Sequence, residues 1–222
     1  MQIFNALVDG MTWILNWLYS LTVSISVPSY GIAIILLTII IKMVLYPLTK
    51  KQMKSMLAMQ QLQPKLKEIQ KKYKDKDPQK MQQKTMELYK KYNINPLAGC
   101  LPLLVQMPIL IALYRSLFEF PYINEAHASF IWVPSLSSGD PYFLLPVLAA
   151  VTTYLQSKMT TTASDPTQRM MLYMMPVFIG YISSIVPAGL ALYWVAFNVV
   201  GSIQQYFINK QGTVIKEEAS GR

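Results

Sequence analysis

Residues 30–48 read YGIAIILLTIIIKMVLYPL, an apolar stretch of 19 residues that contains a single charge, Lys42. A helix needs about 20 predominantly apolar residues to cross the hydrocarbon core of a bilayer. The stretch therefore predicts a membrane-spanning helix. The fold depends on how many such stretches follow it.

Four further apolar stretches lie downstream, and we expect each to span the membrane. They cover residues 97–118, 142–157, 171–187 and 188–208. The last two are nearly continuous, so the chain is predicted to turn tightly at Pro187 and Gly189. The predicted fold class is an all-α membrane protein with five transmembrane helices.

The composition excludes most soluble classes of protein. Hydrophobic residues make up 53% of the chain and charged residues 14%, against about 25% charged residues in an ordinary soluble domain. The net charge of +9 comes from one block, since 14 of the 20 Lys and Arg residues lie between 42 and 91. This segregation disfavours a nucleic-acid-binding domain. The single cysteine, Cys100, excludes an intramolecular disulfide and a multi-cysteine metal site.

The basic block has a helical pattern of its own. Apolar side chains recur at spacings of four, three and four in two runs, which begin at Leu62 and Met81. Between the runs, Asp77 is a predicted N-cap and Pro78 the first residue of the second helix. Residues 49–96 are therefore predicted to form a basic helical hairpin.

The positions of the bases predict the orientation in the membrane, because short loops rich in Lys and Arg stay in the cytoplasm. The predicted hairpin, the loop after the third span and the tail all carry bases, whereas residues 119–141 carry none. We therefore expect the amino terminus outside and the carboxyl terminus inside.

The first residues have an amphipathic pattern, with apolar side chains at helical spacing from Ile3 to Leu18. We expect a helix on the outer surface, and a sixth span stays open as the alternative. The predicted organisation is an outer-surface helix, span one, a cytoplasmic hairpin, spans two to five and a cytoplasmic tail, at residues 1–29, 30–48, 49–96, 97–208 and 209–222.

Polar side chains recur within the predicted spans. A charge at the bilayer centre costs about 2.5–3.5 kcal/mol on insertion scales and usually faces a bundle interior or a wet cavity. No predicted span carries an acid that could pair with Lys42. Water or the carboxylate of an incoming partner would then solvate it; the alternative is that Lys42 reaches to the cytoplasmic interface. The candidate groove residues are Lys42, Thr38, Gln106, Gln156, Trp194 and Asn198.

Several stretches resemble the YidC insertases, which share their core with the mitochondrial Oxa and chloroplast Alb proteins. The matching stretches are IILLTIIIKMVLYPLTKKQMKSM (34–56), NPLAGCLPLLVQMPILIALYRSL (95–117), TYLQSKM (153–159) and GLALYWVAFNVVGSIQQYFI (189–208). The resemblance, to the short five-span bacterial form, implies a multi-pass protein of the bacterial inner membrane. It also implies a hydrophilic groove open to the cytoplasm and the lipid bilayer, and nascent membrane proteins as partners. The ribosome and the Sec translocon stay open as further partners.

In that family the groove contains a positive residue, usually Arg, at the position that matches Lys42. Lysine keeps the charge but lacks the planar fork with which arginine binds a carboxylate through two hydrogen bonds. Gln106, Gln156 and Trp194 resemble polar and aromatic groove residues of the family.

The expected function is membrane protein insertion without nucleotide hydrolysis, without catalytic residues and without a cofactor or metal. The alternative is a small channel or solute transporter gated by Lys42, which the odd number of spans disfavours. An enzyme is disfavoured, since the only histidine, His127, lies in a predicted loop. We interpret it as a solvated residue rather than a metal ligand. The methionines at 170, 171, 174 and 175 are interpreted as packing residues rather than a copper site.

Overall fold

The protein is all-helical over the residues that the structure, a computed structural model, describes: 2–73, 76–92, 101–118, 120–160 and 166–210. The helices are α1 (Gln2–Ser24), α2 (Tyr30–Val44), α3 (Tyr46–Tyr73), α4 (Pro78–Lys91), α5 (Leu101–Phe118), α6 (Leu144–Thr160), α7 (Pro166–Ile185) and α8 (Ala188–Lys210), with a 3-10 turn at Glu125–Ala128. The predicted all-α class is confirmed. Cys100, the predicted start of span two at 97 and residues 211–222 of the predicted tail lie outside the described residues.

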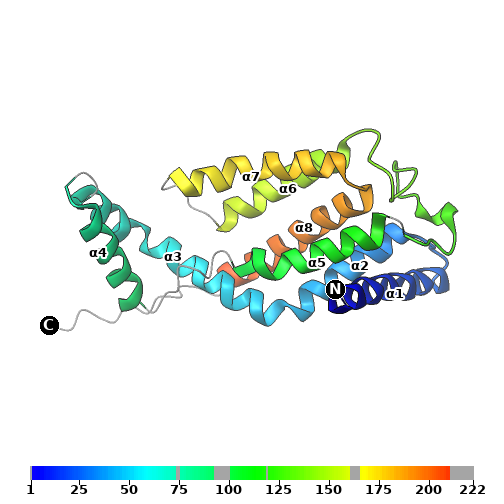
Figure 1. The fold of residues 1–222 in the computed structure, drawn as a ribbon, viewed down its shortest axis with the longest axis horizontal. Helices are drawn as coiled ribbons and strands as arrows, with labels where there is room; N and C mark the ends of the chain where they lie inside the picture. The colour runs from blue at the N-terminus through cyan, green and yellow to red at the C-terminus, as the bar shows by residue number, and fades with distance from the viewer. Residues whose placement is uncertain (1, 74–75, 93–100, 119, 161–165, 211–222) are drawn as a thin grey trace.

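Four helices, α1, α2, α5 and α8, run lengthwise beside one another, while α3 and α4 extend away from them (Figure 1). Helix α8 packs against α2 and α6, and α6 packs against α7. We call the end that carries residues 120–143 the loop end, and the end from which α3 leaves the hairpin end. Over the described residues, α5 makes no extensive contact with α6 or α7.

The first predicted span is shorter than expected, because α2 ends at Val44 rather than at residue 48 and α3 continues at an angle of 68°. Pro47 accounts for the break, since it has no N–H to donate to the carbonyl of Met43 and its ring collides with that carbonyl in a straight helix. Judged by length and hydropathy, none of the described helices qualifies alone as a membrane span, whereas α2 and α3 qualify together as a bent pair.

Helix α1 extends beyond the amphipathic pattern of residues 3–18 and packs along α2 and α5. The rings of Tyr19 and Tyr30 stack with their centroids 4.0 Å apart, and the hydroxyls of Thr12 and Ser116 lie 2.8 Å apart. This side-by-side packing is the arrangement that the sixth-span alternative requires, and the outer-surface position of residues 1–29 stays a prediction.

Hydrogen bonds join the loop end to the helices. The amides of Ala188 and Gly189, which begin α8, donate to the carbonyls of Ser138 at 2.7 Å and Leu136 at 2.9 Å. A side chain on Gly189 would lie 3.1 Å from the Leu136 oxygen, so this approach favours glycine. The start of α8 is therefore held by backbone contacts to the preceding loop.

Aromatic and hydroxyl groups fill the space behind that loop. The Tyr30 hydroxyl donates to Asn16 Oδ1 at 3.2 Å and accepts from the amide of Ile123 at 2.9 Å. Burial raises the pKa of the Tyr122 phenol, and the Ser137 hydroxyl, which donates to it at 3.0 Å, partly offsets that rise. These polar groups of the loop end thus find partners within the protein.

Helices α3 and α4 form a small apolar cluster of their own, in which Leu62 and Leu66 are buried against Leu88 and other residues of α4. Asp77 is the N-cap of α4, because its side chain accepts from the amide of Lys80 at 2.9 Å, and the helix begins at Pro78. The predicted cap is confirmed.

The carboxylate of Asp140 is a structural centre of the loop end. It is 6% exposed and accepts hydrogen bonds from Trp132 Nε1 at 3.1 Å, from the amide of Tyr142 at 3.1 Å and from the amide of Leu145 in the first turn of α6 at 2.6 Å. We predict that Asp140→Ala lowers the free energy of unfolding by about 2–4 kcal/mol, because it removes a helix cap and leaves buried donors unpaired.

The measurement is equilibrium unfolding in mixed micelles followed by tryptophan fluorescence. Glu125→Ala is the matched control, since that acid is exposed in the same segment. Equal stability of the two variants would contradict the structural role of Asp140.

Candidate functional site

The candidate site is centred on Lys42, in the last turn of α2. Its side chain is only 4% exposed, although lysine is one of the residues that proteins bury least often. No carboxylate of a described residue lies within 4.0 Å of the ammonium. The chain therefore holds a buried cation without an anionic partner among the described residues.

The ammonium lies over an aromatic ring instead of in water. Lys42 Nζ is 3.3 Å from the centroid of the Phe197 ring on α8. A cation over a ring face gains about 2 kcal/mol or more when both groups are desolvated. Helix α8 thus closes over the side chain of Lys42.

Gly201, one turn after Phe197 on α8, makes room for the ammonium. A Cβ atom built there would lie 2.9 Å from Lys42 Nζ and would collide with the side-chain amide of Gln156 on α6. Because glycine has no side chain, both polar groups approach the backbone of α8. The geometry thus brings α2, α6 and α8 together around one charge.

Gln204 joins the same cluster from the next turn of α8. Its Nε2 donates to the carbonyl oxygen of Lys42 at 3.2 Å, next to the break between α2 and α3. Gln204 Oε1, Gln205 Oε1 and Gln52 Nε2 are buried without a hydrogen-bond partner. Native proteins leave few buried polar atoms unpaired, and such atoms often mark functional positions.

A second polar contact links α8 to α6. Asn198 Nδ2 lies 3.2 Å from Thr152 Oγ1 and 2.8 Å from Thr153 Oγ1, and donates to both hydroxyls. Asn198 and Phe197 are adjacent in the chain, so this bond fixes the stretch of α8 that carries the ring. Of the six predicted groove residues, the structure places Lys42, Gln156 and Asn198 in one region.

The other three predicted groove residues have separate contacts. Gln106 Nε2 on α5 donates to the Tyr193 hydroxyl at 2.6 Å, and Thr38 Oγ1 donates to the carbonyl of Ile34 at 2.7 Å within its own helix. Trp194 is half-buried and packs against the apolar core. These contacts do not bring all six residues together in one groove.

The polar pattern of the sequence did not single out Phe197 and Gln204. Phe197 is apolar and therefore does not stand out among the residues of an apolar span. Gln204 lies beside Gln205 near the end of the last predicted span, where a polar residue is ordinary for the membrane interface. Their roles follow from contacts with α2, which is 150 residues or more away in the chain.

The residues considered for metal binding have other surroundings. His127 Nδ1 and the Tyr19 hydroxyl lie 2.6 Å apart and share a hydrogen bond. Met170 and Met174 are exposed on α7, at 62% and 59%. Among the described residues, no group of three His, Cys, Asp or Glu side chains is placed to hold a metal ion.

The chain is similar to known proteins in sequence and in fold. Residues 21–216 match the model of a family described as 60Kd inner membrane protein. A protein named membrane protein insertase YidC from Oceanobacillus iheyensis is 45% identical over 207 residues, 88% of this chain and 80% of that protein. Its namesake from Syntrophus aciditrophicus is 45% identical over 83% of this chain and only 34% of its own length. The chain thus spans most of one relative and about a third of the other.

A solved structure has a similar fold. It is described as an active YidC insertase crystal structure with the first transmembrane domain resolved, and it superposes with a TM-score of 0.72 at 32% identity. The alignment covers 92% of this chain and 46% of that one.

The bond from Gln204 to the Lys42 carbonyl is predicted to stabilise the break between α2 and α3. In Gln204→Leu the carbonyl loses its side-chain donor, at a cost of about 1 kcal/mol. We expect amide hydrogen exchange in residues 42–49 to accelerate by roughly fivefold, because local opening becomes easier. Mass spectrometry of the protein in nanodiscs measures this rate.

Gln205→Leu is the control, since Gln205 Nε2 donates to Asn209 within α8 at 2.5 Å and the structure gives it no bond to α2. Acceleration of the same size in both variants would refute the specific role of Gln204.

Proposed function

The chain belongs to the 60Kd inner membrane protein family of YidC insertases, and on this premise we propose that it inserts nascent membrane proteins into the inner membrane of a bacterium. This family is not a class of catalytic enzymes, and the proposal needs no covalent step. The residues around Lys42 would perform the insertion through electrostatic and apolar contacts alone.

The observation that carries the proposal is the unpaired, buried ammonium of Lys42. Burying a charge without a counter-ion is costly, and the ring of Phe197 offsets only part of that cost. An acidic residue of a substrate would supply the missing partner through a charge-assisted hydrogen bond. Lys42 would thus attract the polar tail of a substrate into the inner half of the bilayer.

Movement of α8 or α6 away from Lys42 would open the groove. Gln156 is half-exposed and approaches α8 at Gly201, so we infer that its displacement admits the substrate. The unpaired amide atoms of Gln204 and Gln205 would then be solvated by water or by the substrate backbone. Thr38, Gln106, Trp194 and Asn198 complete the proposed polar lining.

The substrate would leave towards lipid between α5 and the pair of α6 and α7. Over the described residues α5 packs on α1, α3 and α8, whereas α6 packs on α3, α7 and α8, and α7 packs on α6 and α8. Apolar residues of the substrate would move through that side into the hydrocarbon. Transfer of apolar surface from water yields about 25 cal/mol per Å², which drives the step without nucleotide hydrolysis or a cofactor.

The proposed topology has five spans, at residues 30–48 and within 97–208, with the hairpin of residues 49–96 and the tail of residues 209–222 in the cytoplasm. The basic hairpin would meet anionic headgroups, the nascent chain, the ribosome or the Sec translocon. The amino terminus is outside if residues 1–29 lie on the outer surface, and inside if α1 crosses the membrane beside α2.

The channel alternative requires a polar path through the loop end. There the described residues form an apolar and aromatic core, in which Tyr30 and Leu136 are at most 1% exposed. Gating of a channel by Lys42 is therefore the weaker proposal.

Replacement of Lys42 tests the electrostatic mechanism. We expect Lys42→Ala to slow insertion of a single-span substrate with an acidic outer tail by roughly tenfold, about 1.4 kcal/mol of barrier. Lys42→Arg should keep most of the activity because it retains the charge. The measurement is protease protection of the substrate tail in proteoliposomes that contain only this protein and no nucleotide.

Two controls distinguish the effect of losing the Lys42 charge from the effect of damage to the fold. The same substrate with its tail acids changed to Asn and Gln should insert equally well with the wild type and Lys42→Ala. Lys54→Ala removes an exposed lysine of α3 and should leave insertion unchanged. Undiminished insertion of the acidic substrate by Lys42→Ala would rule out the electrostatic attraction.

A further inference from the structure

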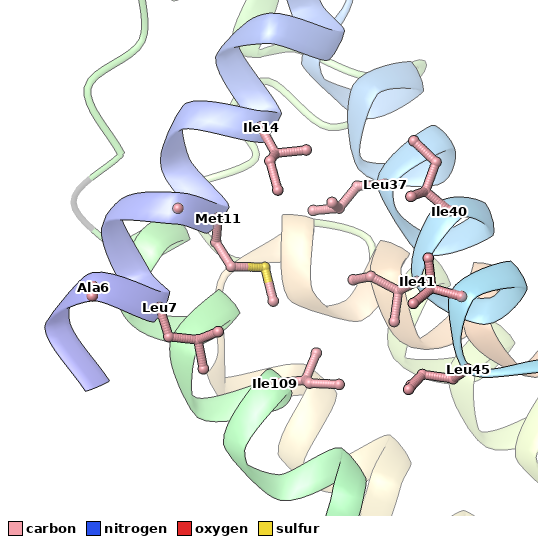
Figure 2. A pocket seen from close by; sticks show the side chains of 11 residues that line it. Ala6, Leu7, Met11, Ile14, Leu37, Ile40, Ile41, Leu45 and Ile109 are labelled. Atoms are coloured by element: carbon pink, nitrogen blue, oxygen red, sulfur yellow. The ribbon is translucent and has the colours of Figure 1, made fainter. Parts of the chain in front are cut away.

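An apolar cavity of about 330 Å³ lies between α1, α2 and α5 near the hairpin end. Figure 2 shows side chains of the three helices facing this space. Met11 and Leu37 form its buried floor, at 7% and 1% exposure, whereas Leu7 and Ile40 on its rim are 38% and 42% exposed. The cavity is therefore an open crevice with apolar walls.

Neither water nor a protein helix suits this crevice. A buried water needs two to four polar partners, and the lining offers only apolar side chains, among them Ile14, Ile41 and Ile109. An empty crevice would forfeit van der Waals contacts along its walls. A helix is about 10–12 Å across with its side chains and is too wide for this volume. A narrow apolar chain fits these limits.

The length of the crevice matches one leaflet of a bilayer. Its lining runs from Ala6 to Ile14 on α1 and from Leu37 on α2 to Leu45, the C-cap of that helix. Eight residue steps of helix span about 12 Å, and one leaflet contributes about half of the 30 Å hydrocarbon core. An acyl chain of a single leaflet can therefore lie along it.

The chain becomes basic directly beyond the crevice. Leu45, the C-cap of α2, is its last lining residue on this side, and α3 then carries Lys50, Lys51 and Lys54 in its first three turns. No acidic residue occurs from residue 42 to residue 67. Lys51 and Lys54 are exposed and Lys50 is half-exposed. Lysines at the membrane surface attract anionic lipids by about 1 kcal/mol each.

We propose that the crevice between α1 and α2 binds one acyl chain of an anionic phospholipid whose phosphate is held by Lys50 and Lys51. The lipid fills the space between the two helices and fixes α1 against the bundle, which requires the arrangement in which α1 crosses the membrane beside α2. This site is separate from the cluster around Lys42 and does not depend on insertase activity.

Gly10 allows a direct test, because it lines the crevice and a Cβ atom at that position meets nothing within 4 Å. Gly10→Leu places a branched side chain in the crevice, whereas Gly10→Ala is the matched control with the same gain in helix propensity. Both are compared with the wild type in nanodiscs that contain phosphatidylglycerol with a diazirine in one acyl chain.

After irradiation, peptide mass spectrometry maps the labelled residues. We expect labels on Leu7, Met11 and Ile41 in the wild type and Gly10→Ala, and about tenfold fewer in Gly10→Leu, which corresponds to a loss of about 1.4 kcal/mol. Labels spread evenly over the exposed faces of α6 and α7 and unchanged by Gly10→Leu would overturn the proposal.

A second variant tests the headgroup contact without filling the crevice. Lys50→Gln with Lys51→Gln should reduce labelling roughly fivefold for each lysine, from about 1 kcal/mol per charge. Lys80→Gln with Lys84→Gln, on α4, is the control and should change nothing. Equal labelling by a diazirine phosphatidylcholine would overturn the anionic preference. The readout is lipid labelling, so a failure here is distinct from a failure of insertion.

Discussion

The buried charge of Lys42 is the constraint to which the surrounding helices conform. An ammonium with 4% exposure and no carboxylate within 4.0 Å in the described residues is stable only if its neighbours replace part of its hydration. Phe197 provides a ring face and Gly201 provides space. The close approach of α2, α6 and α8 is therefore a consequence of the charge as much as of apolar packing.

The two ends of the bundle differ in how completely their polar groups are paired. At the loop end, Asp140 accepts three hydrogen bonds and backbone amides of α8 bind loop carbonyls. Near the hairpin end, Gln52, Gln204 and Gln205 each bury an unpaired atom, whereas towards the loop end the described residues bury one, Ser183 Oγ in the last turn of α7. Local opening costs least where bonds are already missing. The fold thus assigns rigidity to the loop end and movement to the hairpin end, from which a cytoplasmic groove would open.

The sequence predicted those features that depend on local chemistry. The all-α class follows from apolar runs, and the Asp77 cap follows from its place before Pro78. Features that depend on contacts between distant helices were not predictable in this way. Burial of Lys42 under Phe197 requires the register of α8 against α2, and the length of α1 depends on packing against α5. The break before residue 48 could have been predicted from the sequence, because Pro47 alone explains it.

The geometry around Lys42 is compatible with a lysine at this position. An ammonium is compact and can lie 3.3 Å from a ring centroid while it also approaches the backbone at Gly201. A guanidinium is planar and carries five donors that need partners when they are buried. In this chain Lys42 Nζ lies over the Phe197 ring and beside the backbone of α8 at Gly201. The ammonium of lysine therefore suits this closed state better than the guanidinium of arginine. For the proposed mechanism, the position of the charge matters more than bidentate binding of a carboxylate.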